Sequence, residues 1–279
     1  MGGWLRQRCR PRASTGWIVA ALLLAACGSS GEAPSSGVSP SSRPPAPVTG
    51  SEPAVQPGTF PVGFFAPDLI GPARRTFSEQ FVTQVDGHLE VGYPAGSSSP
   101  SSGDPGGAQA KLAIAAGPRL GYTLTYQIRF PVGFQWVRGG KLPGLCGGAC
   151  WTGSHNGPGG WAARFMWRAG GAGEVLLSAA TTTGFGADLG LGDWHFQADG
   201  GWHTLSEQVT MNTPGQPDGS IEVSYDGIRV AALTGLVLRA AGDTEEIDSL
   251  IFSTFFGGSG SSWAPTTAQH IDFRGFSVR

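Results

Sequence analysis

Two short elements of this chain gather the residue types of an anion-binding site. The first is Gly-Gly-Lys-Leu-Pro-Gly-Leu at 139–145, whose Lys141 is one of only two lysines among 18 basic residues. The second is Arg-Phe-Met-Trp-Arg at 164–168, where strand alternation would place Arg164 and Arg168 on one face. Two guanidinium groups that project into one groove suit the bidentate capture of a carboxylate. The alternative is an exposed strand face with solvated arginines, and spacing alone leaves both open.

The composition favours strands, because the chain has 46 glycines and 21 prolines, which disfavour helix interiors. Residues 122–130 alternate apolar and polar side chains with period two, which is typical of a half-buried strand. Similar runs are 163–167, 174–179, 202–211, 220–225, 228–238, 247–256 and 270–278. Asp226-Gly227 between two of these runs predicts a hairpin. Eight or more strands without intervening helices predict an all-β fold, a β-sandwich of jelly-roll type, in one domain at 58–279.

The first 27 residues predict a signal peptide, because four arginines precede an apolar run of ten residues, too short to span a membrane. Leu-Ala-Ala-Cys at 24–27 resembles a bacterial lipobox, so we expect lipidation of Cys27. The alternative is ordinary cleavage after Ala26 that leaves a free cysteine. The Ser, Pro and Gly-rich residues 28–57 predict a disordered linker. We therefore expect a protein anchored by lipid in the bacterial cell envelope, facing the periplasm or the exterior.

The remaining cysteine pair lies in Leu-Cys-Gly-Gly-Ala-Cys at 145–150. In an oxidising exported compartment we favour a disulfide between Cys146 and Cys150, with a metal site as the weaker alternative. The formal charge is −2, and loss of four arginines with the signal peptide would make the mature chain more acidic. A general affinity for nucleic acid is therefore not expected.

Several ordered motifs resemble the family 14 polysaccharide lyases, jelly-roll enzymes that cleave alginate or glucuronan by β-elimination. They are the elements at 139–145 and 164–168 and Phe-Ser-Thr-Phe-Phe-Gly-Gly at 252–258, and the resemblance runs from about 121 to 279. It implies that Lys141 neutralises charge or transfers a proton, and that Arg164 lines the same cleft. An acidic polysaccharide would be the partner. Arg168, Trp136 and His195 are further candidates for binding the sugar chain.

The resemblance fails at the residues of proton transfer. The family carries two tyrosines two residues apart on the next strand, where this chain has Leu176 and Ser178. Some members also carry a serine two residues before the cleft arginine, and this chain has Ala162 there. His195 or His155 could supply an imidazole instead, since imidazole titrates near neutrality. A single histidine is also a common hydrogen-bonding residue without a catalytic role.

Three functions remain open from the sequence. The first is a lyase with an altered proton-transfer group, and the second is a lipid-anchored glycan-binding protein without turnover. A glycoside hydrolase is the third, prompted by Glu-Glu-Ile-Asp at 245–248, although the strand face there continues Glu246, Asp248, Leu250 without a second glutamate. No cofactor is indicated, a Ca²⁺ ion at loop aspartates such as Asp188 and Asp193 is a weaker possibility, and we expect a monomer.

Overall fold

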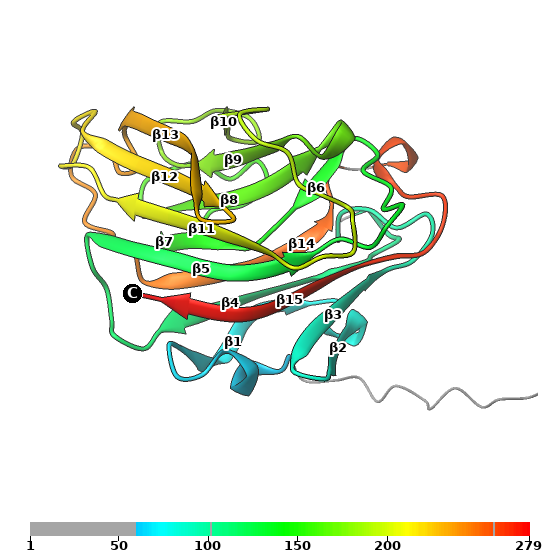
Figure 1. Ribbon diagram of the computed structural model, residues 1–279. Coiled ribbons are helices and arrows are strands. Elements are labelled where there is room, and N and C mark those ends of the chain that lie inside the picture. The colour runs from blue at the N-terminus through cyan, green and yellow to red at the C-terminus, as the bar shows by residue number, and fades with distance from the viewer. Residues whose placement is uncertain (1–59, 101, 259) are drawn as a thin grey trace, which may run out of the picture. The chain divides into compact units, whose positions relative to one another are not determined.

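The computed structural model describes residues 60–100, 102–258 and 260–279 (Figure 1). The predicted signal peptide, the lipidation site Cys27 and the linker at 28–57 lie outside the described residues. Strands form two sheets, and every pair of neighbouring named strands is antiparallel. Among the described residues, no helix has the length and apolar character needed to cross a membrane.

The first sheet carries the two elements that hold Lys141 and the arginines, 139–145 and 164–168, here called the cationic elements. Its strand order is β1 (Leu69–Phe77), β4 (Ala108–Ile114), β14 (Ser249–Phe256), β6 (Gly139–Lys141), β8 (Gly160–Arg168), β9 (Gly173–Ser178) and β10 (Ala187–Leu189). β7 (Gly144–Gly148) continues the line of β6 and also pairs with β14 and β8. The two cationic elements are therefore neighbours in space, since β6 and β8 are hydrogen-bonded.

The second sheet packs against the first. Its strand order is β13 (Ile228–Leu236), β12 (Gly219–Tyr225), β11 (His203–Thr210), β5 (Gly121–Arg129), β15 (Gln269–Val278), β3 (His88–Tyr93) and β2 (Val82–Val85). Short 3₁₀ turns lie at Val62–Phe65, Glu79–Phe81, Ala169–Gly171 and Ser261–Trp263. Figure 1 shows the two layers, with β5 and β15 in front of β14 and β4.

The core lies between the inner faces of the two sheets. On β5 the apolar residues of the alternating run are buried, and the tyrosines Tyr122 and Tyr126 are among them. Phe165 and Trp167 of β8 enter the same core from the other sheet, and the Tyr126 and Phe165 rings meet edge to face at 6.4 Å between centroids. The predicted all-β jelly-roll sandwich is confirmed.

The predicted hairpin at Asp226-Gly227 joins β12 to β13. Both residues have positive φ, 50° and 76°, which is the backbone of a type I′ turn and explains the need for Asp-Gly there. The strands between 69 and 114 were not predicted. β1 has no period-two burial, whereas β3 and the second half of β4 do alternate and were missed.

One carboxyl group is buried between the sheets. Glu207 of β11 is fully buried, and its Oε2 accepts a hydrogen bond of 3.0 Å from the backbone N–H of Leu145 in the opposite sheet. Burial raises the pKa of Glu207 to about 8. The folded protein therefore holds this group as a neutral acid near pH 7.

Stability is expected to fall as the pH rises from about 5 to 8. In this window the unfolded chain has lost the Glu207 proton, because the ordinary pKa is 4.5, while the folded chain keeps it. The unfolded state then binds fewer protons than the folded state. Each pH unit therefore lowers the free energy of unfolding by up to about 1.4 kcal/mol, on the order of 4 kcal/mol over the whole window. Glu207→Gln removes this dependence. Urea unfolding of the unmodified protein and of Glu207→Gln from pH 5 to 8 measures this dependence. If the free energy of unfolding changed with pH in the same way for both proteins, the raised pKa of Glu207 would be contradicted.

Candidate functional site

A cleft of about 790 Å³ crosses the outer face of the first sheet. On β8 the residues alternate: Arg164, Met166 and Arg168 line the cleft, whereas Phe165 and Trp167 belong to the core. The sequence predicted this division of the strand. The cleft is also lined from β6 by Lys141, from β9 by Leu176 and from β10 by Asp188.

Strand register places Lys141 beside the β8 side chains. Lys141 pairs with Met166 across β6 and β8, and with Phe255 of β14 on its other side. The glycines of the Gly-Gly-Lys element make this close packing possible. A Cβ atom at Gly140 would overlap the Trp167 ring, and Gly139 has a φ of 135°.

Arg164 is a buried cation with free donors. It is 1% exposed, and its Nη1 donates to Ser253 Oγ at 3.3 Å. Within the described part of the chain, Nε and Nη2 have no hydrogen-bond partner. Burial lowers the pKa of Arg164 to about 10, so the group stays charged at neutral pH. A buried guanidinium with unused N–H groups is suited to bind an anion.

Arg168 is engaged by carboxylates of the protein itself. Its Nη2 lies 2.7 Å from Glu174 Oε1 and 2.9 Å from Asp188 Oδ1. Glu174 is fully buried, and burial raises its pKa, which the hydrogen bond from Arg168 opposes. Arg168 therefore carries less free positive charge toward a ligand than Arg164 does.

Lys141 has the environment of a proton acceptor. Its Nζ lies 2.6 Å from Met166 Sδ, a weak hydrogen-bond acceptor that stabilises an ammonium poorly. Burial lowers the pKa of Lys141 well below its ordinary value, and the charges of Arg164 and Arg168 lower it further, while Glu174 acts in the opposite direction. A larger share of this amine is thus unprotonated near neutral pH than is usual for lysine.

Aromatic rings form walls of the cleft. Phe77 from the end of β1, Trp263 and Phe185 line it, and Phe185 is 74% exposed. Sugar rings stack on exposed aromatic faces, so these residues suit a carbohydrate chain. Sequence reasoning missed all three. Ser99 and Pro100 also line the cleft.

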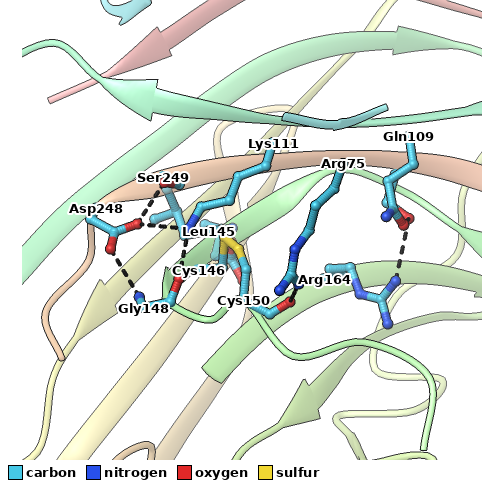
Figure 2. The surroundings of a disulfide bond; sticks show 12 residues. Arg75, Gln109, Lys111, Leu145, Cys146, Gly148, Cys150, Arg164, Asp248 and Ser249 are labelled. Atoms are coloured by element: carbon cyan, nitrogen blue, oxygen red, sulfur yellow. Dashed lines mark hydrogen bonds and ion pairs between the residues drawn. A yellow bond between two sulfur atoms is a disulfide. The ribbon is translucent and has the colours of Figure 1, made fainter. Parts of the chain in front are cut away.

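The structure joins Cys146 of β7 to Cys150 by a disulfide, the pairing that the sequence favoured (Figure 2). Arg75 reaches the same loop and donates from Nη1 to the carbonyl oxygen of Cys150 at 3.4 Å. Thr152 and Gly153 follow directly and line the cleft. The disulfide thus fixes the segment that forms one edge of the cleft.

The second lysine has a structural environment. Lys111 Nζ donates to the carbonyl oxygen of Gly148 at 2.6 Å and lies 3.5 Å from Asp248 Oδ1, as Figure 2 shows. Asp248 Oδ2 accepts a hydrogen bond of 2.9 Å from the Gly148 N–H. Asp248 is occupied in holding this loop and does not line the cleft, so the carboxylates that prompted the hydrolase hypothesis gain no support.

Two predicted sugar-binding residues lie outside the cleft. Trp136 is half-buried and packs against Phe130 of the core, with ring centroids 4.8 Å apart, and its carbonyl oxygen accepts a hydrogen bond from Trp167 Nε1. His195 is an exposed residue that pairs with Ala172 through the backbone. Neither lines the cleft: Trp136 packs against the core, and His195 pairs with Ala172, the residue before β9.

The cleft has no phenol among the residues that the structure describes. All four tyrosines of the chain belong to the core: Tyr93, Tyr122, Tyr126 and Tyr225. Leu176 lines the cleft, opposite Arg164 in the register of β8 and β9, whereas Ser178 is fully buried beside Ala162. Lys141 is therefore the best-placed proton carrier near the two arginines.

A family comparison gives this cleft its context. The model of polysaccharide lyase family 14 matches residues 83–276. The chain belongs to this family. A search of curated protein sequences finds no match.

Solved structures agree with the family assignment. The marine alginate lyase from Aplysia kurodai shares 27% identity and a TM-score of 0.66, over 78% of this chain and 92% of its own. An alginate lyase from a Chlorella virus shares 22% identity and a TM-score of 0.62, over 71% of this chain and 87% of its own. The endo-β-1,4-glucuronan lyase of Trichoderma reesei shares the fold at 10% identity, with a TM-score of 0.50 over 74% of this chain and 89% of its own.

Proposed function

We propose that this chain is a lyase that cleaves an anionic uronate polymer of the alginate or glucuronan type by β-elimination. The observation that carries the proposal is the pairing of a proton-accepting amine with a buried, incompletely bonded guanidinium in one cleft. Lys141 supplies the amine and Arg164 the guanidinium. The alginate lyases and the glucuronan lyase with this fold support the substrate class.

Arg164 binds the uronate carboxylate and stabilises the charge that develops beside C5. Its free N–H groups and its charge favour the enolate-like transition state and make the C5 proton more acidic. The nearby aromatic walls hold the flanking sugars. We therefore assign recognition of the carboxylate to Arg164 and proton transfer to Lys141.

Lys141 takes the C5 proton and returns it. The neutral Nζ accepts the proton, the electron pair forms the C4=C5 double bond, and the bond from C4 to the glycosidic oxygen breaks. The resulting ammonium then donates its proton to the leaving oxygen. One amine thereby performs the two transfers, which replaces the phenol absent at Leu176 and Ser178.

A second candidate function is glycan binding without turnover. The observation that favours it is the apolar Leu176 where the family carries a tyrosine, since a cleft that only binds needs no second proton carrier. Arg164 and the aromatic walls would serve both functions. The two differ only in whether the polymer is cut.

An assay on a panel of uronate polymers separates the two functions. The purified chain is mixed with alginate, glucuronan and other uronate polymers while the near-ultraviolet absorbance of unsaturated uronate is followed. A rise on at least one polymer supports the lyase. Retention on an alginate or glucuronan gel with no rise in absorbance on any polymer supports the binding protein. If neither a rise nor retention were seen, both functions would be contradicted.

We also propose export and anchoring through a lipid on Cys27, on the basis of the lipobox-like sequence. Cys27→Ser is expected to move the protein from the membrane fraction to the soluble fraction, because serine lacks the sulfur that accepts the lipid. Fractionation in a bacterial host followed by immunoblotting measures this. Cys9→Ser is the matched control and should stay with the membrane. A Cys27→Ser protein that still requires detergent would contradict the anchor.

A further inference from the structure

A group of metal-ligating side chains lies on the second sheet, away from the cleft. Strands β3 and β15 are neighbours there, and Asp272 pairs with Glu90 in their register. Alternation places His88 and Glu90 on one face of β3, and His270 and Asp272 on the same face of β15. The intervening residues face the core: Leu89, Val91, Ile271 and Phe273. The four side chains therefore share the outer face of this sheet.

The donor atoms are close enough to share one ion. One ligand atom each from Glu90, His270 and Asp272 lies within 4.8 Å of the other two. His88 Nε2 lies 3.9 Å from Asp272 Oδ1 and brings a second imidazole to the group. Small side-chain rotations would bring such atoms to metal-bonding distances of about 2.0–2.2 Å.

One buried oxygen of Asp272 is available to a ligand. Asp272 is 1% exposed, and its Oδ2 accepts a hydrogen bond of 2.7 Å from Arg129 Nε of β5. Its Oδ1 accepts no hydrogen bond from any described residue. Because β5 and β3 flank β15 on opposite sides, Oδ1 faces the strand that carries Glu90 and His88. A buried carboxylate oxygen without a partner is costly, and a cation at this place would satisfy it.

We propose that His88, Glu90, His270 and Asp272 bind a single Zn²⁺ ion. Two imidazoles with two carboxylates suit Zn²⁺, whereas Ca²⁺ prefers six or more oxygen ligands. Arg129 acts in the outer shell: it orients the Asp272 carboxylate through Oδ2 and leaves Oδ1 for the ion.

The surrounding charges are compatible with a dication. Arg129 and Arg274 are the nearby cations, and both stack on Trp202, with guanidinium carbons 4.6 and 4.1 Å from its ring centroid. The two ligand carboxylates offset the charge of Arg129, and the Arg274 Nε donates to Gln127 at 2.8 Å. The ion would join β3 to β15 on the side opposite the cleft, so its role is structural and independent of the elimination reaction.

Calorimetric titration of the untagged full-length chain with ZnCl₂ tests the proposal. We expect one saturable site and a higher melting temperature with Zn²⁺ than without it, because an ion that binds only the folded state stabilises it. His270→Ala and Glu90→Gln should each weaken Zn²⁺ binding at least about tenfold. CaCl₂ should bind more weakly than ZnCl₂.

Matched control variants are His195→Ala and Glu222→Gln, an exposed histidine and an exposed glutamate elsewhere on the domain. Both should bind Zn²⁺ as the unmodified protein does. Glu90 is itself exposed, so Glu90→Gln should melt normally without metal, which separates lost binding from lost folding. Absence of a saturable site, tighter binding of Ca²⁺, or unchanged Zn²⁺ binding in His270→Ala and Glu90→Gln would each overturn the proposal.

Discussion

Lys141→Met should reduce the rate of polymer cleavage at least about a thousand-fold while leaving the fold intact. Methionine keeps the length of the side chain and its apolar packing against Met166, but it removes the only amine among the described residues that line the cleft. Neither the C5 proton nor the leaving oxygen would then have its proton carrier. Initial rates of unsaturated product, measured at equal protein concentration, give the effect.

His195→Ala is the matched control for this loss. His195 was a candidate for a substitute proton carrier from the sequence, but the structure places it outside the cleft. We expect the rate of this variant to match that of the unmodified protein, and both variants to melt like it. Substantial turnover by a folded Lys141→Met protein would rule out the assigned role, and a large loss in His195→Ala would point to an imidazole instead.

Arg164→Gln should lower the cleavage rate about 10²- to 10³-fold, because the carboxylate loses its buried cationic partner. A second effect follows from the charge. The guanidinium of Arg164 lowers the pKa of Lys141, so its removal should raise that pKa. The amine would then lose its proton only at higher pH.

The pH dependence of kcat/KM distinguishes this account from a simple loss of binding. The acidic limb of the profile reports loss of the proton from Lys141 in the free enzyme, and Arg164→Gln should move it to higher pH. Arg138→Gln is a matched control, since Arg138 stacks on Trp263 with its guanidinium carbon 4.9 Å from the ring centroid and does not line the cleft. Its acidic limb should stay in place. If the acidic limb of the Arg164→Gln profile did not move, the charge of Arg164 would not control the pKa of Lys141.

Local patterns predicted much of the cleft correctly. Alternation along 164–168 separated Arg164 and Arg168 from the core residues Phe165 and Trp167, because side chains of a strand alternate between its faces. Lys141 was marked by the resemblance of its Gly-Gly-Lys element to the family motif, and the structure adds that a Cβ atom at Gly140 would overlap the Trp167 ring. The disulfide between Cys146 and Cys150 was favoured because they are the remaining cysteine pair of a chain expected in an oxidising compartment.

Contacts between distant segments were beyond such patterns. Phe77, Phe185 and Trp263 come from three different parts of the chain, and only the sheet order brings them to one cleft. Trp136 was expected to stack on a sugar ring because it lies near a loop, but its ring packs against the core instead. The same limit applies to Glu90 and Asp272, which are far apart in sequence and become neighbours through the pairing of β3 with β15.

The chemical nature of the cleavage products tests the central claim most directly. The unmodified chain is incubated with mannuronate-rich alginate and with glucuronan, and the oligosaccharides are examined by mass spectrometry and NMR. β-Elimination predicts fragments that lack one water molecule relative to hydrolysis products and that carry a C4=C5 double bond at the new non-reducing end. Saturated fragments would identify a hydrolase, and intact polymer after prolonged incubation would show that the chain does not cut either polymer, so either result would contradict the lyase.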